Sequence, residues 1–80
     1  MQVQIKRGHD FSGTIFALTE PDAMRKIKDE YPDAVGVPWE GDYDRLDPGG
    51  QPKGQIKLVY ENQSTIGRKS RLIARIRKYS

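Results

Sequence analysis

The sequence has no cysteine and only one histidine among its 80 residues. Without cysteine, the chain cannot form disulfide bonds or thiolate metal sites, and it has no thiol nucleophile. His9 stands in a predicted turn beside Asp10 and close to Ser12, and side chains this close in sequence diverge instead of forming a catalytic triad. We therefore expect a protein that is not an enzyme and that has no cofactor and no metal ion.

Long apolar runs are also missing. No stretch approaches the roughly 18 apolar residues of a transmembrane helix, and the N-terminal segment lacks the apolar centre of a signal peptide. We therefore expect a cytoplasmic protein without a membrane span. A chain of 80 residues that is 35% hydrophobic makes one small domain, residues 1–80. Such a core leaves little room for a ligand pocket of about 300 Å³ or more, so we expect function on an exposed face.

The apolar residues that are present follow two periods. Thr19 is a suitable helix cap, and apolar residues then recur at helical spacing up to Pro32, which predicts a helix over about 20–31. Short alternating, β-branched or aromatic runs predict strands at about 2–6, 14–18, 34–37 and 56–61. With a strand at the C-terminal end, the order β-β-α-β-β-β predicts an α+β fold. In this two-layer domain, one helix packs on one face of a four- to five-stranded, mostly antiparallel sheet.

The last two segments need a finer prediction. At 56–61, alternation places Ile56, Leu58 and Tyr60 on one face, so we expect Tyr60 in the core. The segment 68–80 fits either a strand or a helix. We favour the strand, because it forms a hairpin with 56–61; it directs Leu72, Ala74 and Ile76 inward, and Arg71, Arg75, Arg77 and Tyr79 partly outward. As a helix, the segment would instead be basic and amphipathic, as in proteins that bind membrane surfaces.

Positive charge is concentrated at the C-terminal end of the chain. The net charge is only +3, yet residues 51–80 contain eight lysines and arginines against one acid, Glu61. Several cations on one face can displace the counterions of a nucleic acid, although solvated edge strands are also often basic. We expect the following residues to contact nucleic acid or an acidic partner: Lys53, Lys57, Arg68, Lys69, Arg71, Arg75, Arg77 and Lys78.

An acidic segment precedes this basic end, and a long loop is predicted at about 40–53. It does not fit an EF-hand calcium loop, because counting from Glu40 puts Arg45 at the glycine position and Gln51 at the glutamate position. The loop is either simply solvated or a contact for a basic partner. The candidate contacts are Trp39, Asp42, Tyr43, Asp44 and Asp47.

These patterns predict a small non-enzymatic binding module. The basic C-terminal face is expected to contact nucleic acid or a nucleoprotein. The alternative is a small protein-binding inhibitor or adaptor, of the type that phages and mobile elements encode, which docks on a host protein complex. A homodimer through an exposed sheet edge is compatible with both hypotheses. No motif indicates a particular family.

Overall fold

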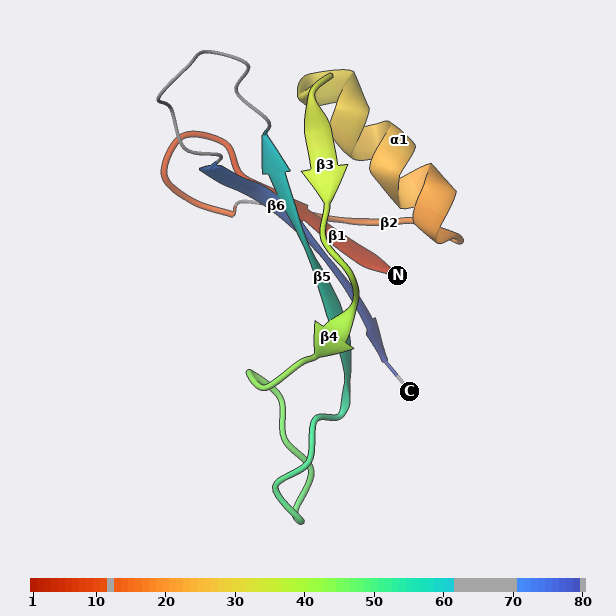
Figure 1. Cartoon of the computed structure of the whole chain (residues 1–80), viewed down its shortest axis with the longest axis vertical. Helices are drawn as coiled ribbons and strands as arrows, with labels where there is room; N and C mark the ends of the chain where they lie inside the picture. The colour runs from red at the N-terminus through yellow and green to blue at the C-terminus, as the bar shows by residue number, and fades with distance from the viewer. Residues whose placement is uncertain (12, 62–70, 80) are drawn as a thin grey trace.

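The computed structural model describes residues 1–11, 13–61 and 71–79, and within them six strands form one antiparallel sheet. The strands are β1 (Gln2–Ile5), β2 (Thr14–Phe16), β3 (Ala34–Gly36), β4 (Glu40–Gly41), β5 (Gly54–Glu61) and β6 (Arg71–Tyr79). Their order is β2-β1-β6-β5-β3, and β4 also pairs with β5. The single described helix, α1 (Glu20–Glu30), lies on one face of the sheet (Figure 1). The predicted α+β fold is confirmed, with β4 as an additional short strand.

Helix α1 begins and ends as its sequence predicts. The hydroxyl of Thr19 accepts a hydrogen bond from the backbone N–H of Asp22 at 3.2 Å, which satisfies one of the unpaired donors of the first turn. At the other end, the backbone N–H of Tyr31 donates to the carbonyl of Ile27 at 2.9 Å. The Tyr31 hydroxyl donates to the carbonyl of Lys6 at 2.6 Å, so the end of the helix is tied to the end of β1.

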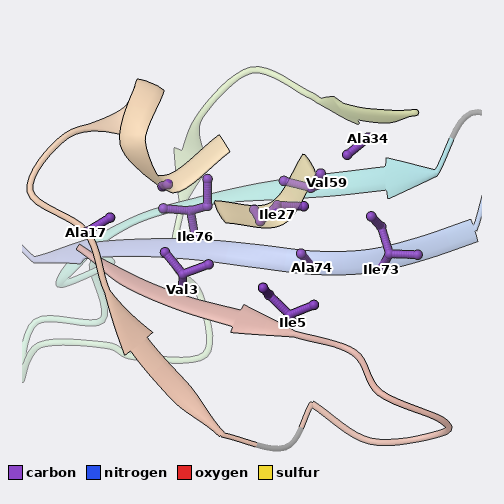
Figure 2. Close-up of a cluster of buried hydrophobic side chains, with 10 residues drawn as sticks. Val3, Ile5, Ala17, Ile27, Ala34, Val59, Ile73, Ala74 and Ile76 are labelled. Atoms are coloured by element: carbon purple, nitrogen blue, oxygen red, sulfur yellow. The ribbon is translucent and has the colours of Figure 1, made fainter. Parts of the chain in front are cut away.

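The hydrophobic core lies between α1 and the face of the sheet that the helix covers (Figure 2). Because side chains alternate along a strand, this face contains every second residue of β1 and of the regular part of β6. The helix contributes Ala23 and Ile27, which are both fully buried. They pack in one cluster with Val3, Ile5, Ala17, Ala34, Val59, Ile73, Ala74 and Ile76.

The face predicted for the core side of β5 is wrong. Val59 is fully buried in the core, so the helix-covered face of β5 holds Val59 and Lys57. The lysine is tolerated there because its apolar stem is covered, while its Nζ reaches Oε1 of Glu20 at 2.9 Å. Alternation separates the two faces of a strand, but it does not show which face the helix covers. The opposite face holds the three residues predicted to point inward: Ile56, Leu58 and Tyr60.

The C-terminal segment is a strand, as predicted, and it pairs with both β1 and β5. The register changes at a β-bulge, because Val59 pairs with Ala74 whereas the next residue, Tyr60, pairs with Leu72. The extra residue, Ile73, is 1% exposed and lies in the core, and Leu72 is only partly buried. The prediction that Leu72 points inward is therefore wrong, since regular alternation does not continue through a bulge.

The strand also removes the basis of the membrane-surface hypothesis, which required a helix at this end of the chain. In the part of the chain that the structure describes, no helix is long and apolar enough to cross a membrane.

The acidic segment predicted as a long loop extends the β4–β5 hairpin (Figure 1). Its backbone is closed by hydrogen bonds from Asp47 N–H to the carbonyl of Gln51 at 2.8 Å and from Lys53 N–H to the carbonyl of Arg45 at 2.9 Å. The Asp47 carboxylate accepts from the backbone N–H groups of Gly49 and Gln51 within the turn. Asp47 therefore shapes the turn of this hairpin.

Candidate nucleic-acid interface

Strand alternation divides the predicted basic residues between the two faces of the sheet. Lys57 and Lys78 lie on the helix-covered side, where both ammonium groups approach the Trp39 ring. Arg75 and Arg77 lie on the opposite side, which we call the open face. The open face is defined by Gln2 and Gln4 of β1, Ile56 and Leu58 of β5, and Arg75, Arg77 and Tyr79 of β6.

The other predicted basic residues lie apart from the open face or outside the described residues. Arg71 forms an exposed ion pair with Glu61 at 2.9 Å, at the far end of β6. Lys53 is exposed at the base of the acidic hairpin. The positions of Arg68 and Lys69 lie outside the described residues.

Arg77 is the most buried of the predicted basic residues, with 7% of the residue exposed. Its Nη2 donates to Oδ2 of Asp44 at 2.8 Å, and its Nε lies 3.4 Å from Oδ2 of Asp42 without forming a hydrogen bond. Asp42 is itself only 2% exposed. Arg77 points away from the helix-covered core, as the alternation predicts, but it is not available to a partner, because the acidic hairpin folds back and covers this guanidinium.

Arg75 occupies the centre of the open face. Its guanidinium carbon lies 4.5 Å from the centre of the Phe11 ring, and its Nε donates to Oε1 of Gln4. Among the described residues, no carboxylate forms an ion pair with Arg75. Burial lowers the pKa of Arg75 from its ordinary value, and the positive charge of Arg77 lowers that pKa further. Asp44 and Asp42 attract this charge without forming an ion pair with it, so Arg75 is a partly desolvated cation that no described carboxylate pairs with directly.

A second arginine–aromatic pair lies near the end of β6. The guanidinium carbon of Arg45 is 4.6 Å from the centre of the Tyr79 ring. The Tyr79 hydroxyl donates to Oε1 of Gln2 at 2.8 Å, yet 47% of Tyr79 remains exposed. Arg45 also forms no ion pair within the described ranges. The open face and the adjoining hairpin therefore present two arginines that stack on aromatic rings, Arg75 and Arg45.

Trp39, predicted as a partner contact, belongs to a polar cluster at the start of α1. Its indole N–H donates to Oε2 of Glu20 at 3.1 Å, and Lys57 forms an ion pair with the same carboxylate. Lys78 places its Nζ 4.4 Å from the centre of the indole ring. These contacts join the N-terminal end of the helix to β5 and β6 on the side away from Arg75.

The Glu20 cluster makes stability depend on pH. The hydrogen bond from Lys57, followed by that from Trp39, holds the pKa of Glu20 below its ordinary value. Because the pKa of Glu20 is lower in the folded state, the stability that these contacts contribute is present above the unfolded-state pKa. It is lost as the pH falls through the folded-state pKa. We expect Lys57→Met to reduce the acid-side loss of thermal stability, measured as melting temperature against pH. An identical acid limb in both proteins would contradict this assignment.

Several residues on or beside the open face were not among the predicted binding residues, including Gln2, Gln4, Phe11, Arg45 and Tyr79. The alternation of Gln2 and Gln4 with buried residues indicates that both point away from the core. Arg45, the one base in an acidic segment, is the visible exception in that charge pattern. For Phe11, which precedes β2 in a loop, the sequence offers no signal.

Two further findings concern metal binding and similarity to known proteins. Within residues 1–11, 13–61 and 71–79, no three histidine, aspartate or glutamate side chains form a group that could hold a metal ion. Comparison with protein-family models, with curated proteins and with solved structures found no match.

Proposed function

We propose that this protein binds nucleic acid through the open face of its sheet, with Arg75 as the central phosphate contact. The observation that supports the proposal is the state of Arg75: it is partly buried, it is held by Phe11 and Gln4, and none of the described carboxylates pairs with it. A guanidinium held in one position is well suited to a phosphate group, because its planar donors match the phosphate oxygens.

Arg45 supplies a second cation on the same side of the molecule, beside Tyr79. Two stacked arginines and nearby aromatic rings combine charge for the backbone with flat surfaces for the bases. The proposal limits the phosphate-binding part of the basic C-terminal surface to this face, because Arg77 is paired with the acidic hairpin and Arg71 is paired with Glu61. A nucleic-acid partner is consistent with a cytoplasmic location, which is part of the proposal.

The proposal predicts a specific effect of Arg75→Gln. In fluorescence anisotropy at about 50 mM salt, affinity for labelled oligonucleotides should fall roughly tenfold, because one phosphate contact is lost. The slope of log affinity against log salt should become shallower by about 1. Glutamine retains a polar side chain beside Gln4, and a thermal melt checks that the variant folds.

Arg25→Gln is the matched control, since Arg25 lies on α1, away from the open face, and pairs with Asp22. This variant should bind like the wild type. If the wild type bound no single-stranded or double-stranded DNA or RNA at about 50 mM salt, the proposal would be wrong. Equal effects of the two substitutions would show that binding depends on total charge and does not use the open face.

A second candidate function, docking on a host protein as an inhibitor or adaptor, is favoured by one observation. Three apolar residues at and after the edge strand β2 are exposed: Ile15 by 39%, Phe16 by 69% and Leu18 by 94%. A monomer normally exposes few such residues together, and clusters of them often mark protein contacts. This function predicts a complex with one defined protein that survives nuclease treatment and is unchanged by Arg75→Gln.

A further inference from the structure

Two shallow hollows lie on either side of the last two described residues of β6. One has a volume of about 280 Å³ and is lined by Lys78 and Tyr79 together with Pro52, Gly54 and Gln55. The other has a volume of about 380 Å³ and is lined by the same two residues together with Met1, Gln2 and Phe16. Small-molecule sites usually have volumes of about 300–1,000 Å³, and both hollows lie near the lower end of that range. Each hollow therefore suits a flat group of modest size.

The Tyr79 ring between these hollows is held in position. Its hydroxyl donates to Gln2, and the guanidinium of Arg45 stacks against the ring at 4.6 Å. A ring that is already fixed loses little conformational entropy when a second flat group stacks on it. Nearly half of Tyr79 is nevertheless exposed, which leaves ring surface available to a ligand.

The residues around Tyr79 provide groups for both parts of a nucleotide. Arg45, stacked on Tyr79, offers a cation for a phosphate, whereas Lys78 lines both hollows but holds its ammonium over the Trp39 ring on the helix-covered side. Gln2 uses its Oε1 for Tyr79, so its amide N–H₂ group remains to donate to an acceptor on a base edge. Gln55 lines the other hollow and offers a second amide.

The same surface does not fit a double helix. The major groove of a duplex admits an α-helix or a two-stranded β-ribbon. Helix α1 packs on the opposite side of the sheet, and the protruding ribbon is the β4–β5 hairpin (Figure 1). Arg45 of this hairpin contacts the Tyr79 ring. Asp42 and Asp44 of that hairpin are paired with Arg77, but Asp47 lies in its turn, and a ribbon inserted into a groove would bring this negative charge between two phosphate backbones.

From these observations we infer that the protein binds single-stranded nucleic acid and that a base stacks on Tyr79. This inference rests on the proposed function. Bases of a single strand are free to leave their neighbours and lie in the two hollows, with the connecting phosphates near Arg45. Bases of a duplex have no exposed faces for such contacts. The site therefore selects strands by their accessibility and tolerates different base sequences.

The test compares single strands with a duplex and removes only the Tyr79 ring. Anisotropy is measured with labelled oligonucleotides of about 12 nucleotides, as single-stranded DNA, as single-stranded RNA of the same sequence, and as the DNA duplex. We expect at least tenfold tighter binding of a single strand than of the duplex. Tyr79→Leu should weaken single-strand binding by roughly 5- to 100-fold and should leave weak duplex binding unchanged.

Tyr79→Phe is the matched control, because it keeps the ring and loses only the hydroxyl contact with Gln2. It should stay within about threefold of the wild type, since a neutral hydrogen bond contributes little net free energy. NMR of the wild-type protein gives a second measurement. The Tyr79 ring protons should shift upfield when the single strand is added. This measurement remains decisive if Tyr79→Leu fails to fold.

The outcomes separate this inference from the proposed function. Equal binding of duplex and single strand, or no effect of Tyr79→Leu together with unshifted ring protons, would overturn the inference while Arg75→Gln still weakens binding. No binding of any oligonucleotide would overturn both. A preference for the DNA or the RNA strand would identify the source of the ligand and would support the inference in either case.

Discussion

Arg77→Met should lower the free energy of unfolding by about 3–5 kcal/mol, the typical effect of leaving one partner of a buried ion pair uncompensated. Asp42 is 2% exposed, so its carboxylate cannot regain water without movement of the hairpin. Asp44 would lose its hydrogen bond as well, although its side chain is 72% exposed and can be solvated. Small domains have about 5–15 kcal/mol of stability, so the variant should be marginally folded.

Chemical denaturation measures this effect, and the chain contains a matched control. Arg71→Met removes an arginine from the same strand whose side chain is 60% exposed, in an ion pair with Glu61. Exposed pairs contribute about 0–1 kcal/mol, so this variant should be almost as stable as the wild type. Adding Asp42→Leu to Arg77→Met should recover much of the lost stability, because no unpaired buried charge remains. Equal effects of Arg77→Met and Arg71→Met would contradict the buried pair.

Ile73→Ala should also have a large effect, about 2–5 kcal/mol of unfolding free energy, because it removes three carbons from a residue that is 1% exposed. Leu72→Ala should have the smaller effect. Leu72 is only partly buried and lies outside the core cluster, so part of its apolar surface is already in contact with water.

The comparison of these two neighbours tests the β-bulge directly. Without the bulge, regular alternation from Ala74 would place Leu72 in the core, and Leu72→Ala would then be the more destabilising change. Both variants lose aliphatic carbons and keep the same charge, so differences between them report burial. Equilibrium denaturation with a common slope for both proteins gives the two free energies on one scale.

The Arg77 pair and the open face are connected through the acidic hairpin. Asp42 and Asp44 hold the start of the hairpin against β6, and the next residue, Arg45, reaches the Tyr79 ring. The position of Arg45 on the candidate interface therefore depends on the contacts that two predicted site residues, the buried Asp42 and the exposed Asp44, make with Arg77. A predicted binding residue such as Arg77 contributes to the site by positioning the hairpin.

Local sequence signals determined most of the secondary structure. The cap at Thr19 and the apolar stripe ending at Tyr31 predicted α1, because helix ends depend on short-range hydrogen bonds. The hairpin of β5 with β6 followed from the simplest connection between neighbouring strands. These features require only interactions between residues that are near one another in the chain. For the same reason, the sequence indicated that Gln2 and Gln4 face away from Val3 and Ile5.

Tertiary structure alone decided which side of each strand is buried and which charges remain available. Val59, not Tyr60, faces the helix, and Ile73 replaces Leu72 in the core, because strand register and the bulge depend on contacts across the sheet. From composition, the basic residues at the C-terminal end of the chain were expected to form one surface. Pairing with the acidic hairpin neutralised Arg77, whereas Arg75 stayed without a carboxylate partner among the described residues. Charge pairing between distant segments acts through space, so net charge along a sequence cannot reveal it.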